Sequence, residues 1–269
     1  MKFGMPTLIE FNSIEENIEL AKALNLDFIE LNLDLPYCNL PGTELLDLSN
    51  KYNIEFTAHL SEKLDVAELD NDLRLAYLNK IEKIIRWGTS NNITKYNLHL
   101  DPGIHFSLPD KKIFIYEKYI DKYKQALTDS CSHLSKIAEK YNIEIMFENL
   151  KSFDYLLNGF KIISSYNNLY FTLDMGHDIR NGNNIQAFFE HYPSKIKHVH
   201  LHDFNGKSDH LELGTGIVNI EEKIDFIEKY NTYAVIEVKR KEDLINSVHY
   251  INNIIKTKEE RNKYDNKRI

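Results

Sequence analysis

The chain has 269 residues, of which 42% are hydrophobic and 12% aromatic, and its formal net charge is −8. This composition excludes a disordered or fibrous chain, and no stretch approaches the roughly 18 consecutive apolar residues that a membrane-spanning helix needs. The negative charge disfavours non-specific binding to nucleic acid or to anionic lipid.

The first residues, MKFGMPTLIEFNS, contain no apolar segment of the kind found in secretory signals. The two cysteines, Cys38 and Cys131, are too few for a disulfide framework and are typical of small buried hydrophobic side chains. We therefore expect a soluble protein of the reducing cytoplasm.

Short stretches rich in β-forming residues alternate along the chain with amphipathic stretches of helical period. In chain order, the expected strands span residues 2–8, 27–31, 54–60, 93–100, 143–149, 169–175, 197–203 and 233–238. The clearest helical patterns between them cover residues 14–24, 72–88 and 116–141. Alternation of this kind produces parallel strands joined by crossover helices, and eight units in a chain of this length match a (β/α)8 barrel.

The expected fold is therefore an α/β TIM barrel that forms a single domain over residues 1–258, followed by a charged tail at 259–269. The end of the chain, KTKEERNKYDNKRI, interleaves acidic and basic residues, as is typical of a solvated or frayed terminus. An open doubly wound sheet is the alternative. It is disfavoured because the chain has no GxGxxG motif, and its glycine cluster, LGTG at 213–216, follows the seventh expected strand.

Alternate residues of a barrel strand face the barrel axis, and functional side chains lie at the carboxyl ends of the strands. Applied to the third to eighth expected strands, this alternation puts an imidazole or a carboxylate last on each inner face. These side chains are His59, His99, Glu148, Asp174, a histidine from the row His198, His200 and His202, and Glu237.

Each of these side chains has a simpler explanation when it is considered alone. A histidine at a strand end is commonly a hydrogen-bonded surface residue, and Asp174 has the position of a helix N-cap. Together, such groups converging on one rim would be buried at high cost unless a cation neutralises them. The donors are nitrogen and oxygen without thiolate, which suits Zn²⁺, Mn²⁺, Co²⁺ or Mg²⁺.

Motifs along the chain resemble the superfamily of xylose-isomerase-like TIM barrels, which joins sugar and sugar-phosphate isomerases and epimerases to endonuclease IV. The motifs are AHL at 58–60, LHLDPG at 98–103, FENL at 147–150, LDMGH at 173–177, HVHLHD at 198–203, DHLELGTG at 209–216 and IEV at 236–238. Each is a weak signal by itself, but the ordered set covers nearly the whole chain. The resemblance implies a metal-dependent enzyme.

In the epimerase branch, one divalent ion is bound by four residues that correspond to Glu148, Asp174, His200 and Glu237. The resemblance implies that the two glutamates transfer protons on opposite faces of a sugar carbon, next to a carbonyl that the metal polarises. It also implies that His177 contacts the substrate. The choice of His200 follows the step H-x-x-[DE] in HLHD, and His202 remains the alternative ligand.

In the endonuclease IV branch, three zinc ions use additional ligands, which correspond to His59, His99, His177 and His210. That branch has Asp-x-His before its glycine loop, whereas this chain has Ser208, Asp209 and His210, so the aspartate is displaced by one residue. The displacement argues against a third ion. The chain also has no series of basic, aromatic-bearing loops suited to an abasic duplex, which disfavours nucleic acid as a partner.

Further candidates for substrate binding follow from position. Lys239 and Arg240 follow the eighth strand, and a glycine-rich loop follows the seventh, where barrels often bind phosphate. A basic helix start that faces solvent explains the two cations equally well. Glu30, at the end of the second strand, either hydrogen-bonds a sugar hydroxyl or is a buried structural carboxylate, and His202 is a further candidate contact.

The leading hypothesis is a metal-dependent isomerase or epimerase that acts on a small sugar or sugar phosphate. It uses one to three divalent ions, with Zn²⁺ or Mn²⁺ preferred. The first alternative is a zinc phosphodiesterase of the endonuclease IV type, and the second is a barrel that binds a metal or metabolite without turnover. Assembly into a homo-oligomer is compatible with the sequence.

Overall fold

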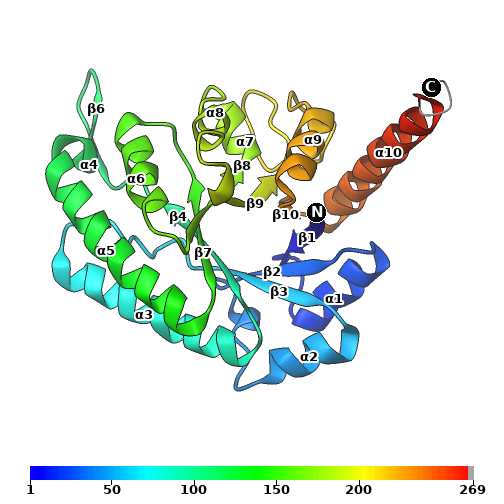
Figure 1. Cartoon of the computed structure of the whole chain (residues 1–269), viewed down its shortest axis with the longest axis horizontal. Helices are drawn as coiled ribbons and strands as arrows, with labels where there is room; N and C mark the ends of the chain where they lie inside the picture. The colour runs from blue at the N-terminus through cyan, green and yellow to red at the C-terminus, as the bar shows by residue number, and fades with distance from the viewer. Residues whose placement is uncertain (266–269) are drawn as a thin grey trace.

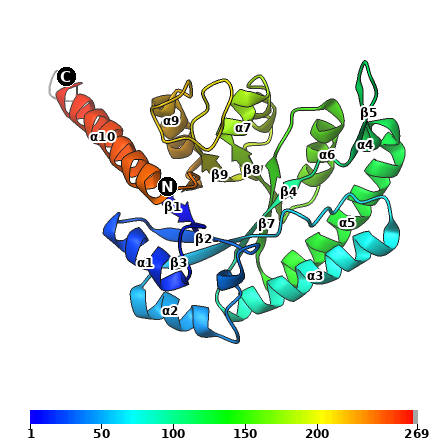
Figure 2. The same cartoon turned by 180° about the vertical axis from the view of Figure 1, so that it is seen from behind.

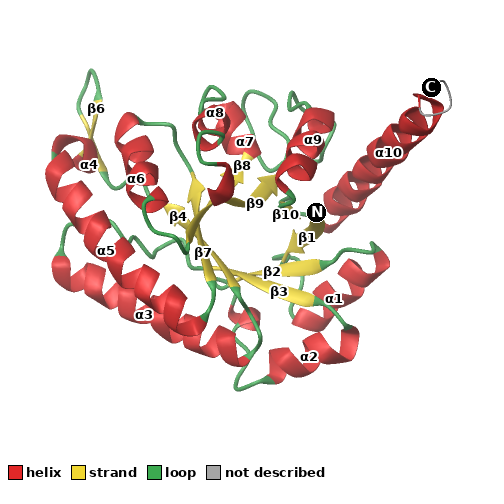
Figure 3. Cartoon of the chain, in the orientation of Figure 1, coloured by secondary structure: helices red, strands yellow, loops and turns green. Residues whose placement is uncertain are grey.

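The computed structural model describes residues 1–265, and its centre is a closed barrel of parallel strands surrounded by helices (Figures 1 and 3). Around the barrel the strands follow the order β1-β10-β9-β8-β7-β4-β3-β2. Their bounds are β1 Lys2–Pro6, β2 Phe28–Asn32, β3 Glu55–His59, β4 Lys95–Leu100, β7 Glu144–Asn149, β8 Leu169–Asp174, β9 Ile196–Leu201 and β10 Tyr233–Ile236. The predicted (β/α)8 barrel is confirmed, and every predicted barrel strand is present.

Helices connect successive strands on the outside of the barrel. They are α1 Ile14–Ala23, α2 Glu44–Tyr52, α3 Asn71–Ser90, α4 Ile115–Lys118, α5 Ile120–Tyr141, α6 Asp154–Ser164, α7 Met175–Arg180, α8 Ile185–Phe189, α9 Ile220–Tyr230 and α10 Lys241–Asp265, with the 3₁₀ helices η1 Pro36–Cys38 and η2 Pro193–Lys195. Turns from a helix into the next strand repeatedly place an asparagine in the left-handed region, at Asn25, Asn53, Asn92, Asn142 and Asn231. Asparagine tolerates this conformation, so these helices end without glycine.

Outward-facing strand residues such as Phe147 and Val199 form the main hydrophobic core with the helices. The interior of the barrel is more mixed. Phe28 packs at its amino end, where a Cβ on Gly4 would lie 2.6 Å from the Phe28 ring, so only glycine leaves room for that ring. Polar side chains such as Asn97 are buried farther along the axis, which places charged and polar groups toward the carboxyl ends of the strands.

The segment between β4 and β7 differs from the prediction. The single helix expected over 116–141 is divided into α4 and α5 at Tyr119, whose φ of −114° and ψ of 49° are not helical. Before α4, the strands β5 His105–Ser107 and β6 Lys112–Phe114 form an antiparallel hairpin beside α4 (Figures 1 and 2). Strands of three residues are too short to show a period of two in the sequence.

Helix α10 extends away from the barrel toward the carboxyl terminus (Figure 2). Its first half is anchored by the buried side chains of Leu244, Val248 and Ile251. The helix continues through residues 259–265 of the expected charged tail, and residues 266–269 lie outside the described part of the chain. The domain boundary at residue 258 remains a prediction. None of the helices within residues 1–265 has both the length and the apolar character needed to cross a bilayer.

Candidate metal centre

A cavity of about 630 Å³ opens at the carboxyl ends of the barrel strands. The polar side chains that line it include Glu30, His59, His99, Glu148, His177, Arg180, Asp209, His210, Glu237 and Lys239. They come from β-strand ends, from the loops that follow them and from α7. In TIM-barrel enzymes this end of the barrel carries the active site, so the cavity lies where strand parity predicts a functional centre.

Glu148, Asp174, His200 and Glu237, hereafter the four-donor group, meet beside this cavity, which Glu148 and Glu237 line. Each offers a ligand atom that lies within 4.8 Å of the others. The Nδ1 atom of His200 is 3.2 Å from Oε2 of Glu148 and 3.1 Å from Oε2 of Glu237. Although β10 ends at Ile236, the backbone N–H of Glu237 donates to the carbonyl of Leu201 at 2.9 Å, which continues the pairing of β10 with β9 by one residue.

The donor atoms of this group fit a divalent cation. Glu148 and Asp174 are 1% and 0% exposed, so two carboxylates are withdrawn from water side by side. Nδ1 of His200 and Oε2 of Glu237 are buried and have no hydrogen-bond partner among the residues that the structure describes. Buried lone pairs directed at one another are unfavourable unless a proton or a cation lies between them. One imidazole nitrogen with carboxylate oxygens suits Zn²⁺ or Mn²⁺.

The charges of the group lead to the same conclusion. Burial opposes a charge on His200, but Glu148, Glu237 and Glu30 raise its pKa well above the ordinary value. Burial also favours a neutral Glu148, yet His200 and His99 hold its pKa well below the ordinary value. For Glu237, burial is opposed by Lys239 and His200, which lower its pKa. Protonated His200 and Lys239 therefore supply positive charge to these carboxylates, and a divalent cation at the same point would take the place of the His200 proton.

Two residues apart at the end of β9, His200 and His202 have different partners. Nε2 of His200 is 2.9 Å from Oε1 of Glu30, and because a carboxylate only accepts, Nε2 carries a proton and Nδ1 is the nitrogen that a cation can bind in place of a proton. Nδ1 of His202 instead accepts the backbone N–H of His210 at 2.9 Å, while Nε2 lies 3.0 Å from Oδ1 of Asp174. Both nitrogens of His202 are engaged, so His200 is the candidate ligand.

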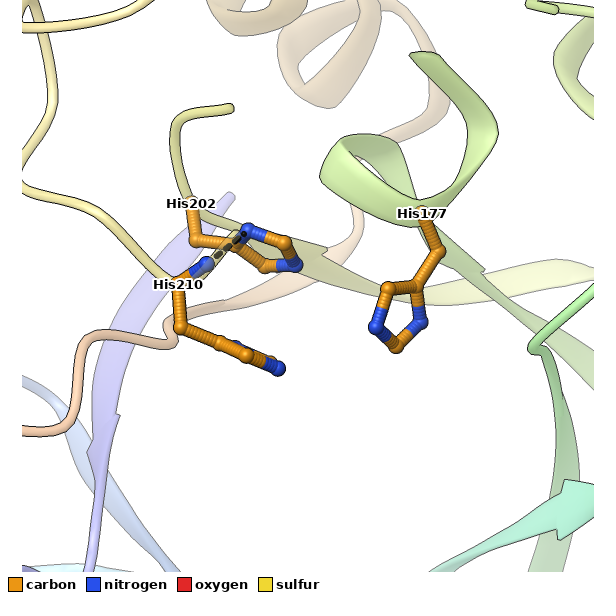
Figure 4. A group of neighbouring side chains, drawn as sticks. All are labelled: His177, His202 and His210. Atoms are coloured by element: carbon orange, nitrogen blue, oxygen red, sulfur yellow. Dashed lines mark hydrogen bonds between the residues drawn. The ribbon is translucent and has the colours of Figure 1, made fainter. Parts of the chain in front are cut away.

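His177, His202 and His210, hereafter the three-histidine group, lie close together (Figure 4). Contacts of His177 and His202 with Asp174 place them beside the four-donor group. The rings of His202 and His210 stack at a centroid distance of 4.1 Å, and the His177 ring, from α7, lies 5.4 Å from each. The backbone N–H of His177 donates to Oδ1 of Asp174 at 2.6 Å, and its Nδ1 is 3.1 Å from Oδ2 of Asp174. Asp174 is therefore both the N-cap of α7 and a member of the four-donor group.

His59 and His99 approach Glu148 from β3 and β4. Nε2 of His59 is 3.2 Å from Oε2 of Glu148, and Nε2 of His99 is 3.5 Å from Oε1. Burial disfavours a charged His59, but Glu148 outweighs burial and raises the pKa of His59 to about 9. Together with Glu148, the two histidines form a second set of donors able to bind a cation.

The displaced aspartate, Asp209, forms an ion pair with Nη1 of Arg180 from α7. Its Oδ2 atom is 3.9 Å from Nε2 of His177. The guanidinium therefore supplies positive charge at the place where a further ion would lie between Asp209 and His177. His210 follows in a left-handed conformation with a φ of 53°, and burial lowers its pKa to about 4.

Asp203 fixes the glycine-rich loop that follows β9. Its buried carboxylate accepts the backbone N–H groups of Phe204, Gly214, Gly216 and Val218 at 2.8–3.0 Å. A Cβ on Gly216 would lie 2.3 Å from Oδ1 of Asp203, which requires glycine there. The N–H groups of Gly214 and Gly216, expected from their position to bind phosphate, instead bind a side chain of the protein itself.

The other predicted substrate-binding residues are separated by the structure. Lys239 lines the cavity, and its Nζ donates to Oε1 of Glu237 at 2.7 Å. Arg240 lies outside the cavity wall, where it is exposed and pairs with Asp243 in the first turn of α10. His202 is fully buried and does not line the cavity. Its ring packs so closely against Gly176 that there is no space for a Cβ on that glycine.

Two asparagines that hold the four-donor group were not predicted as site residues. Nδ2 of Asn97 donates to Oε2 of Glu148 at 2.6 Å, and its Oδ1 accepts from Thr172. The side chain of Asn149 bonds both the N–H and the carbonyl of Asp174. The sequence contained a signal for Asn97, which shares the inner face of its strand with His99, but none for Asn149.

The closed barrel and its ring of carboxylates and imidazoles define a TIM barrel with a candidate metal centre at the catalytic end. The chain belongs to the xylose isomerase-like TIM barrel family, whose model matches residues 18–258. A curated relative, the uncharacterized protein MJ1614 of Methanocaldococcus jannaschii, is 28% identical over 249 residues, which cover 90% of this chain and 93% of the relative.

Solved structures show the same architecture. A D-tagatose 3-epimerase-like protein has a TM-score of 0.81 and 26% sequence identity, with 97% of this chain and 99% of that chain covered. The IolI protein, whose crystal structure contains a zinc atom, has a TM-score of 0.75 and 15% identity, with 96% of this chain and 99% of that chain covered. The likeness to the IolI protein is one of fold.

Proposed function

We propose that this chain is a metal-dependent isomerase or epimerase of a small sugar or sugar phosphate. The observation that carries the proposal is the four-donor group, in which buried ligand atoms of His200 and Glu237 converge with two further carboxylates beside a cavity. The similarity to a D-tagatose 3-epimerase-like protein and the zinc atom of the IolI protein support it.

Glu148, Asp174, His200 and Glu237 would hold one divalent ion, with Zn²⁺ or Mn²⁺ preferred over Co²⁺ or Mg²⁺. When bound, the ion polarises a substrate carbonyl and acidifies the hydrogen on the neighbouring carbon. Of the two glutamates, one removes that proton and the other returns a proton to the opposite face of the carbon. Because Glu148 and Glu237 both line the cavity, each can reach a carbon positioned above the group.

Substrate recognition in this proposal uses the cavity wall above the ion. His177 offers an imidazole and Lys239 an ammonium group to the hydroxyl or phosphate oxygens of the sugar. The ion pair between Lys239 and Glu237 brings this ammonium group next to a proton-transfer residue. Binding and proton transfer are therefore coupled through one contact.

A zinc phosphodiesterase of the endonuclease IV type is the second candidate function. The observation in its favour is the donor set of His59, His99 and Glu148, which could bind an additional ion. The pairing of Asp209 with Arg180 argues against a third ion. Metal analysis separates the candidates, since near one ion per chain favours the epimerase and near three favours the nuclease, which would also cleave an abasic-site oligonucleotide. A barrel that only binds metal or metabolite would bind without any turnover.

The decisive experiment is exchange of the substrate α-hydrogen with solvent deuterium, followed by NMR over a panel of ketoses and their phosphates. We expect exchange by the metal-loaded protein, and a fall of at least about 100-fold in Glu148→Gln and in Glu237→Gln, because general acid–base catalysis contributes that much. Glu55→Gln is the matched control, since Glu55 lies at the opposite, amino end of β3 and pairs with Lys2. Metal-loaded protein without exchange on any member of the panel contradicts the proposal.

A further inference from the structure

Beneath the four-donor group lies a buried carboxylate that the proposed chemistry does not use. Glu30, from β2, is 2% exposed, and its two oxygens face two histidines of β9. Oε1 is 2.9 Å from Nε2 of His200, and Oε2 is 3.0 Å from Nε2 of His198. Thr57 donates to Oε2 as well, at 3.3 Å. A carboxylate so far removed from water is costly unless its partners compensate for the lost hydration.

The contact between Glu30 and His200 determines which nitrogen of His200 is free. An ionised carboxylate has no proton to donate, so Nε2 of His200 must be the protonated nitrogen. When a cation displaces the second proton of the ring, the lone pair that binds it is on Nδ1, the atom that lies 3.2 Å from Glu148 and 3.1 Å from Glu237. The ring of His200 is fully buried, with Glu30 next to one of its nitrogens and Glu148 and Glu237 next to the other.

We propose that Glu30 is a positioning residue of the metal centre, which holds His200 in the Nε2–H tautomer and directs its Nδ1 atom at the ion. The inference rests on the proposed function and gives a role to a residue that contacts His200 instead of the ion. Carboxylates that accept the second N–H of a ligating histidine orient the ring and increase its basicity. Loss of such a partner typically lowers metal affinity about 10–100-fold.

Glu30, His198 and His200 allow one competing arrangement, in which they bind a second ion. Their donor atoms lie within 4.8 Å of one another. That arrangement requires His200 to lose its Nε2 proton and bridge two ions. His198 is better explained by packing, because its ring lies 6.2 Å from that of Phe28 and 5.2 Å from that of His200. It fills the barrel below His200 and limits the movement of Glu30.

The test is calorimetric titration of chelator-treated, full-length protein with Zn²⁺ and with Mn²⁺. We expect Glu30→Gln to bind about 10–100-fold more weakly than wild type, because its side chain no longer fixes the tautomer. Glu62→Gln is the matched control, since Glu62 lines the same cavity but does not contact His200. NMR of ¹⁵N-labelled histidines gives a second readout, in which the Nε2–H pattern of His200 should be lost in Glu30→Gln and retained in Glu62→Gln.

The outcomes separate this inference from the proposed function. Wild-type protein that binds no ion overturns the proposed function itself. Equal affinities of Glu30→Gln and Glu62→Gln, with tight binding by wild type, overturn the positioning role alone. A second ion that is lost in His198→Gln also overturns it, by making Glu30 a ligand. If Glu30→Gln does not melt cooperatively, Glu30→Asp keeps the charge with a shorter reach, and wild-type affinity in that variant contradicts the role.

Discussion

The four-donor group and the three-histidine group lie side by side, and both bring metal-binding side chains within 4.8 Å of one another. They differ in whether their donor atoms are free. Within the described residues, Nδ1 of His200 and Oε2 of Glu237 have no hydrogen-bond partner, whereas both nitrogens of His202 are engaged by His210 and Asp174. The comparison teaches that proximity alone does not distinguish the two groups, and that the partners already held by each donor atom favour the four-donor group as the candidate metal site.

The largest expected effect on metal affinity comes from removing the charge of Asp174, the residue that contacts both groups. Asp174→Asn should lower metal affinity by more than about 100-fold, because a ligand oxygen and a buried negative charge are lost together. His202→Gln should lower affinity only about tenfold, because His202 orients Asp174 without touching the ion. Calorimetric titration of chelator-treated protein with Zn²⁺ measures both values.

Which of these two variants loses more affinity shows which of the two groups binds the metal. A greater loss in His202→Gln than in Asp174→Asn would mean that His202 is itself a ligand and that the three-histidine group is the metal site. His191→Gln serves as the control, since His191 is an exposed residue whose ring bonds the backbone carbonyl of Ala187, outside the cavity lining. Its affinity should equal that of wild type.

The pH dependence of stability should distinguish the surroundings of the two groups in the metal-free protein. Glu148 raises the pKa of His59 to about 9 despite burial, so His59 stabilises the fold below pH 6.5 and this contribution is lost as the pH rises to about 9. Burial lowers the pKa of His210 to about 4, so the unfolded chain takes up the proton first and stability falls as the pH drops from 6.5 to 4. Each effect is on the order of 3 kcal/mol.

Thermal melting from pH 4 to pH 9.5 measures both slopes, and each histidine has its own variant. His59→Gln should flatten the alkaline limb, and His210→Gln should flatten the acid limb. Saturating Zn²⁺ should raise the melting temperature most on the alkaline side, where His59 and His200, whose pKa values are raised, have lost their protons. An alkaline limb unchanged by His59→Gln would show that Glu148 does not govern the charge of His59.

The ring of candidate ligands could be predicted because a strand alternates with a period of two, and one register assigns Glu148, Asp174 and Glu237 to the same face as the histidines. The same rule places His200 and His202 on one face and therefore cannot choose between them. Their difference depends on partners distant in the chain, since Glu30 lies 170 positions from His200. No local pattern encodes which nitrogen carries a proton.

Loops were predicted less well than strands for a related reason. The glycine-rich loop after β9 has the composition of a phosphate-binding loop, yet its N–H groups are used by Asp203. Likewise, the displaced Asp209 pairs with Arg180, a contact that depends on how α7 and the loop approach each other. Composition predicts which groups a loop offers, whereas the partner is set by tertiary packing.

The smallest effects are expected from the two cations that follow β10, and they should differ. Lys239 lines the cavity and donates to Glu237 at 2.7 Å, so Lys239→Gln should lower kcat/KM for deuterium exchange about tenfold, the lower end for a hydrogen bond to a charged group that is half exposed. Arg240 lies outside the cavity and pairs with Asp243, so Arg240→Gln should leave kcat/KM unchanged. The two variants remove the same charge from adjacent residues whose side chains point to different surroundings. A difference between them would therefore show that the position of the charge in the cavity matters, and not its sign alone. An equal loss in both variants would indicate a diffuse electrostatic effect, which added salt should then remove.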